Sequence, residues 1–199
     1  MKGTLVFMIV MFVVGLVIGA TLGPSLTGAP AGTVIQTITV AQTVTSAATQ
    51  SIGGSLVRYC FSPGGNCASV LVSLINNADI SVHVLIYSFT LDNVADALIQ
   101  AKGRGVDVKV VMEKDNALGS GSEYTRLKSA GIDIRLDTNS ALMHDKVAII
   151  DAHVIVTGSF NWSSAANDRN NENMIVIDSQ AWAVTYEATF QTIYNTAMP

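Results

Sequence analysis

Residues 144–176 read HDKVAIIDAHVIVTGSFNWSSAANDRNNENMIV, and this stretch carries most of what the sequence says about fold and chemistry. Polar and small residues stand in it at fixed intervals: His144-x-Lys146, then four residues and Asp151, then six residues and Gly158-Ser159-Phe160-Asn161. An imidazole, an ammonium, a hydroxyl and an amide can together attack and hold a tetrahedral phosphodiester. A carboxylate, Glu172, follows just before the next apolar run. The spacing is specific because it fixes several positions at once.

Two short apolar runs fill the intervals of this motif. Residues 146–151 and 153–157 are rich in Val and Ile and are joined by a turn too tight for a helix, so they predict an antiparallel strand pair. Side chains alternate along a strand, so His144 and Lys146 are expected on one face. The run that starts at Gly158 then falls where the following strand ends, a place where α/β sheets present reactive groups.

Elsewhere the chain alternates strand and helix patterns, which predicts an α/β sandwich with a mixed sheet flanked by helices. Further strands are expected at residues 55–61, 80–89, 106–112, 132–136 and 174–177. Helices are expected at residues 66–78, 92–103, 122–131, 162–167 and 181–196. Asp92 and Ser122 stand where the N-terminal caps of two of these helices would lie.

The motif resembles the signature of the phospholipase D superfamily, His-x-Lys-x(4)-Asp-x(6)-Gly-Ser-x-Asn. The resemblance is closest to the small single-motif members, the bacterial secreted endonucleases and the mitochondrial-surface nuclease/phospholipase of the Zucchini type. It extends to residues 59–90, which contain YCFSPGG and IYSFT, and to residues 103–112, GRGVDVKVVM. It covers residues 56–199 in all and implies a phospholipase D-like fold for that part of the chain.

The resemblance implies double displacement at phosphorus. His144 would attack as a neutral imidazole and form a phosphohistidine, while Lys146 would supply positive charge to the nonbridging oxygens. Ser159 and Asn161 match positions that donate hydrogen bonds to the phosphate. Glu172 matches the carboxylate that orients the nucleophilic histidine and favours its correct tautomer.

Asp151 and Gly158 are expected to shape the motif rather than to react. The mechanism also needs a second histidine, which protonates the leaving oxygen and then deprotonates water. His83 and His153 lie in apolar strand contexts with no following lysine, which is typical of structural histidines. The second histidine is therefore expected to be His144 of another subunit, in a homodimer with its site at the two-fold interface. No metal and no other cofactor is implied.

Cys60 and Cys67 are the only cysteines of the chain. Two sulfurs without a nearby histidine cannot form a structural zinc site, so the zinc module of the Zucchini-type relatives is absent. In an exported domain, a disulfide that closes the loop at residues 62–66 is expected. Two separate buried thiols are the alternative.

The first quarter of the chain lies outside the resemblance. Residues 4–23 carry no charged side chain and are long enough to cross a bilayer, which takes about 17–25 residues of helix. Residues 1–23 are thus expected to be a membrane anchor or a cleaved signal peptide, with a buried core helix as a third reading. Lys2 favours an orientation that leaves the rest of the chain outside the cytoplasm, membrane-anchored or, after cleavage, secreted. Residues 24–54, rich in Thr, Ser, Ala, Gly and Gln, predict a linker.

The expected catalytic domain, residues 55–199, is acidic. It holds all 15 acidic residues and ten of the 11 basic ones, so its net charge with neutral histidines is 10 − 15 = −5. Nucleic-acid binding depends on Lys and Arg that neutralise phosphates, and no run of them is visible beyond the rim candidates Lys114, Arg126 and Arg169. The relatives nevertheless favour a nonspecific endonuclease of DNA or RNA. A phospholipase acting on membrane phospholipids is the alternative, followed by a catalytically silent, surface-tethered binding module.

Overall fold

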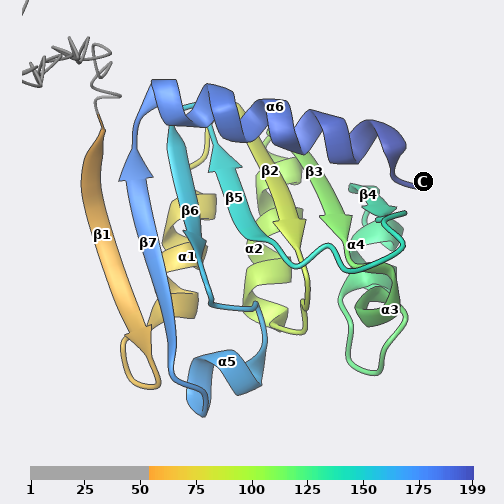
Figure 1. The fold of residues 1–199 in the computed structure, drawn as a ribbon, viewed down its shortest axis with the longest axis horizontal. Helices are drawn as coiled ribbons and strands as arrows, with labels where there is room; N and C mark the ends of the chain where they lie inside the picture. Colours follow the sequence, from red (N-terminus) through yellow and green to blue (C-terminus); the bar gives the residue numbers. More distant parts are fainter. Residues whose placement is uncertain (1–53) are drawn as a thin grey trace, which may run out of the picture. The chain divides into compact units, whose positions relative to one another are not determined.

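The computed structural model describes residues 54–199, so the predicted anchor or signal segment and nearly all of the linker lie outside the described residues. The described part contains one seven-stranded sheet with the strand order β1-β7-β6-β5-β2-β3-β4 (Figure 1). Its strands are β1 (Ser55–Ser62), β2 (Ser81–Ile86), β3 (Asp107–Met112), β4 (Asp133–Leu136), β5 (Lys146–Ile150), β6 (Val154–Gly158) and β7 (Glu172–Asp178). The pairs β2–β3 and β3–β4 are parallel and the other pairs are antiparallel, which confirms the predicted mixed sheet.

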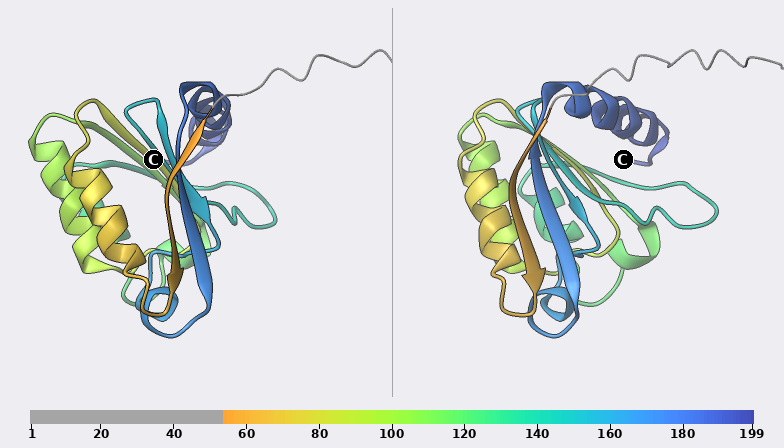
Figure 2. Two further views of the ribbon diagram at one scale, coloured as in Figure 1. Left: turned by 90° about the vertical axis from the view of Figure 1, so that its left-hand side faces the viewer. Right: turned by 60° about the vertical axis from the view of Figure 1, so that its left-hand side comes forward.

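Helices cover both faces of this sheet. They are α1 (Cys67–Asn76), α2 (Asp92–Gly103), α3 (Lys114–Ala117), α4 (Tyr124–Ser129), α5 (Ser164–Asp168) and α6 (Gln180–Thr196). The pair α1 and α2 packs on one face, and α6 crosses the other (Figure 1 and Figure 2). Leu71, Val94 and Val110 belong to the larger core on the first face, and Ile149 and Phe190 to the smaller core under α6. Within residues 54–199, no helix has both the length and the apolar character that a membrane span requires.

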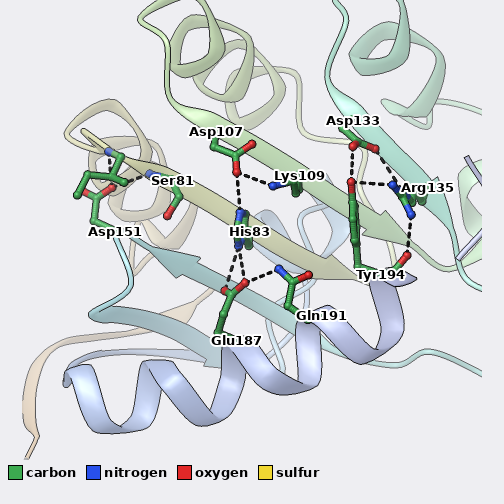
Figure 3. Close-up of polar contacts among 11 residues, drawn as sticks. Ser81, His83, Asp107, Lys109, Asp133, Arg135, Asp151, Glu187, Gln191 and Tyr194 are labelled. Carbon is green, nitrogen blue, oxygen red and sulfur yellow. Dashed lines mark hydrogen bonds and ion pairs between the residues drawn. The ribbon is translucent and has the colours of Figure 1, made fainter. Parts of the chain in front are cut away.

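Polar contacts fasten α6 to the sheet (Figure 3). The buried His83 of β2 stacks on Phe190 with ring centroids 4.7 Å apart, and its Nδ1 lies 2.9 Å from Glu187 Oε1. Near the end of the helix, the Tyr194 hydroxyl donates a hydrogen bond to Asp133 on β4. Burial and this contact raise the pKa of Tyr194 to about 12. His83 therefore serves helix packing, as expected of a structural histidine.

The β5–β6 hairpin confirms the predicted antiparallel pair. Ile150 pairs with Val154, so residues 151–153 form the turn, in which Asp151 and Ala152 lie in the left-handed region with φ of 51° and 56°. The Asp151 carboxylate accepts hydrogen bonds of 2.7–3.0 Å from the amides of Asp79, Ile80 and Ser81 (Figure 3). Burial disfavours the charged carboxylate, but these backbone hydrogen bonds outweigh it and lower the pKa of Asp151. The residue thus ties the turn to the start of β2.

The two expected helix caps are wrong. The N-cap of α2 is Leu91, whose apolar side chain cannot accept a hydrogen bond, and Asp92 is the first residue of the helix. The N-cap of α4 is Glu123, and Ser122 Oγ accepts a hydrogen bond from the Tyr124 amide at 3.2 Å in the turn before the helix. Periodicity also does not predict α3, since four residues are too few to show a helical repeat.

Cys60 of β1 and Cys67, the first residue of α1, are joined by a disulfide with their Cα atoms 5.6 Å apart. Both residues are buried on the face of the sheet that α1 covers. The bond connects the edge strand β1 to the helix that packs behind it. It also closes the loop between them, which is the loop that the sequence led us to expect.

Candidate active site

Three strand ends meet at one edge of the sheet. β5 begins at Lys146, β6 ends at Gly158 and β7 begins at Glu172, and antiparallel pairing brings these ends side by side. They border a cavity of about 290 Å³ whose walls are formed by His144, Lys146, Gly158, Ser159, Asn161 and Glu172. The structure thus gathers every residue of the motif that was predicted to attack or bind a phosphate. Asp151 is not among them, because it lies at the other end of the hairpin.

Lys146 is a buried cation, with only 7% of its surface exposed. Its Nζ donates a hydrogen bond of 2.7 Å to the backbone carbonyl of His144 and lies 4.7 Å from the centre of the Tyr87 ring. Burial lowers the pKa of Lys146, and the carboxylates of Asp145 and Glu172 offset part of this effect. Because little water reaches this ammonium, it attracts a phosphate oxygen more strongly than a surface lysine would.

His144 presents its ring to solvent at the mouth of the cavity while its neighbours are held in place. The imidazole lies against the Tyr87 ring, with centroids 4.4 Å apart and planes tilted by 59°. The Met143 amide donates to Glu113 Oε2 at 2.7 Å, and the Asp145 carbonyl accepts from the Tyr87 amide at 3.0 Å. These two hydrogen bonds fix the backbone on both sides of residue 144, so the exposed imidazole is attached to a well-anchored backbone segment.

Ser159 is oriented by Asn173 on β7. The Ser159 Oγ accepts hydrogen bonds from the Asn173 amide at 3.1 Å and from Asn173 Nδ2 at 3.4 Å. A hydroxyl has two acceptor positions and one hydrogen, so this hydrogen stays available for a ligand in the cavity. Gly158 allows the arrangement: its φ is 145°, and a Cβ there would lie 2.3 Å from the Asn173 carbonyl oxygen. The same oxygen accepts from the amides of Ser159 and Phe160.

Asn161 belongs to a loop whose neighbouring side chains are buried. Phe160 and Trp162 are each 2% exposed, and Trp162 packs edge-on against Phe89 with ring centroids 5.0 Å apart. Both aromatic rings therefore pack in the core and do not flank a substrate groove. Asn161 Oδ1 is buried and has no hydrogen-bond partner among residues 54–199. The unpartnered oxygen can only accept a hydrogen bond, so the phosphate contact predicted for Asn161 has to come from the two hydrogens of its Nδ2.

Glu172 lines the cavity, but it is not paired with the nucleophile candidate. Its Oε1 accepts a hydrogen bond of 3.1 Å from Asn170 Nδ2. In the part of the chain that the structure describes, it makes no hydrogen bond to the imidazole of His144. The orienting role predicted for Glu172 requires one of the two side chains to rotate, and it stays a prediction.

The rim of the site has fewer free cations than the sequence suggested. Arg126 forms ion pairs with Glu123 and Asp96, so carboxylates already neutralise its guanidinium, and its expected place at the rim stays a prediction. Lys114 and Arg169 are the two remaining candidates. The described residues hold no group of three or more His, Cys, Asp or Glu side chains arranged to bind a metal ion.

A second cavity, of about 550 Å³, adjoins the first through His144. It runs along the segment of residues 137–145 and the last turns of α6, and its lining includes Asp137, Asp145, Thr192 and Ile193. No Lys or Arg side chain contributes to its walls. The nucleophile candidate therefore faces one cavity with a buried cation and one with carboxylates and hydroxyls.

Three further residues that lie outside the motif shape the site. Tyr87 contacts both His144 and Lys146, Asn173 orients Ser159, and Glu113 is fully buried beneath the segment that leads to His144. A polar residue directly after an apolar strand is a visible signal for Glu113. The contacts of Tyr87 and Asn173 arise between strands, so the local pattern carries no sign of them.

Comparison with known proteins gives one consistent picture. A family model described as cardiolipin synthase, PLD-like domain, matches residues 71–194. The phospholipase D of Rickettsia typhi is 37% identical over 130 residues, which are 65% of this chain and 64% of that protein. The mitochondrial cardiolipin hydrolase of Xenopus tropicalis is 33% identical over 127 residues, 64% of this chain and 60% of that protein.

A solved structure is similar over a larger share of its length. The crystal structure of Nuc, a phospholipase D family member from Salmonella typhimurium, matches with a TM-score of 0.69 and 34% identity. The match covers 73% of this chain and 97% of Nuc. By contrast, the matched region spans less than two thirds of the length of each of the two relatives named above.

Proposed function

The chain belongs to the phospholipase D superfamily, and on this premise we propose that it hydrolyses phosphodiesters, with nucleic acid as its preferred substrate. The observation that carries the proposal is the 290 Å³ cavity. It brings an exposed imidazole, a buried ammonium, a hydroxyl with a hydrogen to donate and a side-chain amide to one place. These are the groups that an in-line attack on phosphorus needs.

The proposed reaction proceeds in two displacements. His144 attacks phosphorus, a nitrogen–phosphorus bond forms, and the bond to the leaving oxygen breaks as a second histidine protonates that oxygen. Water then attacks the phosphohistidine, loses its proton to the second histidine and releases His144. The Lys146 ammonium, the Ser159 hydroxyl and the Asn161 Nδ2 donate to the nonbridging oxygens, and the burial of Lys146 strengthens its interaction with their charge.

We expect the active protein to be a homodimer, because the cavity contains one histidine and the reaction uses two. Light scattering of the purified protein should give twice the chain mass. Heterodimers of one wild-type and one His144→Ala chain, isolated with two affinity tags, should retain less than about a tenth of wild-type activity, since both histidines serve one reaction. Half of the wild-type activity, or a fully active monomer, would show that each chain works alone.

A phospholipid is the second candidate substrate, and two observations favour it. The described domain is acidic, and the 550 Å³ cavity beside His144 has no Lys or Arg in its walls. A polyanion gains little from such a surface, whereas a neutral or cationic group next to the phosphodiester fits it.

Salt dependence separates the two candidates. If nucleic acid is the substrate, cleavage at subsaturating concentration should fall about tenfold or more as salt rises from about 50 to about 200 mM, because each neutralised phosphate releases counterions. Circular DNA, RNA and phosphatidylcholine vesicles should be assayed in parallel, with His144→Ala as the blank. Salt-independent hydrolysis of the vesicles, with DNA and RNA left intact, would instead identify a phospholipase.

We also infer that the catalytic domain works outside the cytoplasm. The Cys60–Cys67 disulfide suits an oxidising compartment, and disulfides are rare in cytosolic proteins. The apolar segment at residues 4–23 would deliver the domain there, either anchored in the membrane or secreted after cleavage.

A further inference from the structure

Tyr87 is placed beside the site by the sheet itself. It directly follows β2, and β2 pairs with β5 in a register that sets Ile86 opposite Lys146. The ladder continues one step further, where the Tyr87 amide donates to the Asp145 carbonyl at 3.0 Å. The position of this half-buried tyrosine is therefore fixed relative to the two residues on either side of Asp145, His144 and Lys146.

The Tyr87 ring contacts both the imidazole of His144 and the ammonium of Lys146. Its centroid lies 4.4 Å from that of the His144 imidazole, and 4.7 Å from Lys146 Nζ. We propose that Tyr87 is a positioning residue of the phosphodiesterase site, whose ring orients the nucleophilic imidazole and supports the buried ammonium. The inference rests on the proposed function and names a residue outside the motif.

The two contacts act in different ways. The face of an aromatic ring attracts a cation, and the attraction is stronger where water is excluded, as it is around Lys146. This attraction favours the charged lysine against the burial that disfavours it. The contact with His144 restricts an exposed ring that the backbone hydrogen bonds of its neighbours leave free to rotate.

The ring and not the hydroxyl carries both effects. Within residues 54–199 the Tyr87 hydroxyl makes no hydrogen bond, whereas the ring makes both contacts. Tyr87→Phe should therefore keep kcat within about twofold of wild type, and Tyr87→Leu should lower kcat by about 10- to 100-fold with a smaller change in KM.

The pH profile distinguishes positioning from a merely structural role. Without the ring, the charged form of Lys146 loses support, so the pKa of Lys146 falls further and the alkaline limb of the activity profile moves to lower pH. The activity should be measured with bis(p-nitrophenyl) phosphate. Phenylalanines carrying one, two and three ring fluorines, placed at position 87, weaken the attraction for a cation while keeping the ring's outline, and should move the limb stepwise.

Titration of the Lys146 amine by NMR gives a readout that needs no turnover. The pKa of Lys146 should be lower in Tyr87→Leu than in Tyr87→Phe, with equal thermal stability of the two variants. An unchanged lysine titration would overturn the inference, as would wild-type kcat in Tyr87→Leu or an equal loss in both variants. A wild-type protein that cleaves no phosphodiester would overturn the proposed function instead, and the NMR result would still decide the role of the ring.

Discussion

Replacing His144 with alanine is expected to reduce phosphodiester hydrolysis by at least about 10³-fold, because the variant lacks the atom that attacks phosphorus. The side chain is exposed at the cavity mouth, so its removal leaves no hole in the core and the thermal stability should stay unchanged. Initial rates with a chromogenic diester and a thermal melt of the same preparation measure both quantities.

A matched control is available in the same hairpin. His153 lies in its turn, with Nδ1 3.1 Å from Asp178 Oδ1 and no place in the cavity walls. His153→Ala should therefore keep full activity. Both proteins should be assayed in EDTA, which we expect to leave the wild-type rate unchanged, since the proposed mechanism takes its nucleophile and its positive charge from side chains. Activity that is lost in EDTA and restored by magnesium would contradict this mechanism.

Gly158→Ala is expected to cost about 2–4 kcal/mol of folding stability and most of the activity. The alanine Cβ would approach the Asn173 carbonyl oxygen to 2.3 Å, and the φ of 145° is one that L-residues rarely adopt. Relief requires β6 and β7 to separate where Asn173 also holds Ser159. Urea unfolding followed by circular dichroism measures the loss of stability, and initial rates measure the loss of activity.

Gly103→Ala provides the comparison for this loss. Gly103 ends α2, and a Cβ there would meet nothing within 4 Å. The substitution should change the free energy of unfolding by less than about 1 kcal/mol, in the stabilising direction if at all. Equal destabilisation by both substitutions would mean that the close approach of Gly158 to Asn173 has no special importance.

Much of the fold follows from periodicity in the sequence. The apolar runs that predicted the β5–β6 hairpin and the mixed sheet are short but regular and are separated by clear turn signals, so their assignment as strands leaves few alternatives. The helix caps failed for a physical reason. Asp92 and Ser122 each stand one residue from the observed N-cap, and the local pattern does not fix the residue at which a helix begins.

The candidate site, too, could be predicted only in part from the sequence. Residues on the motif could be found because one hairpin and the loop after it bring them together. Tyr87 could not be given its contacts in advance, because they depend on the register between β2 and β5. The ion pairs of Arg126 could not be foreseen either, because charge alone does not tell whether a nearby carboxylate pairs with a cation.

The turn at Asp151 gives the family signature a double meaning. Asp151 accepts hydrogen bonds from backbone amides one strand's length away from the cavity, so selection for folding alone can preserve it. His144 and Lys146 line the cavity, so selection for activity preserves them. One inserted residue in the strand would turn the side chains beyond it to the opposite face. The spacing of the motif therefore fixes the lengths of the two strands of the hairpin. During evolutionary divergence, the structural positions and the catalytic positions of the signature can therefore be lost independently of each other. A homologue that keeps Asp151 and the spacing but has lost His144 would still fold and would still match the rest of the signature, so its catalytic competence must be judged from the residues at the strand ends.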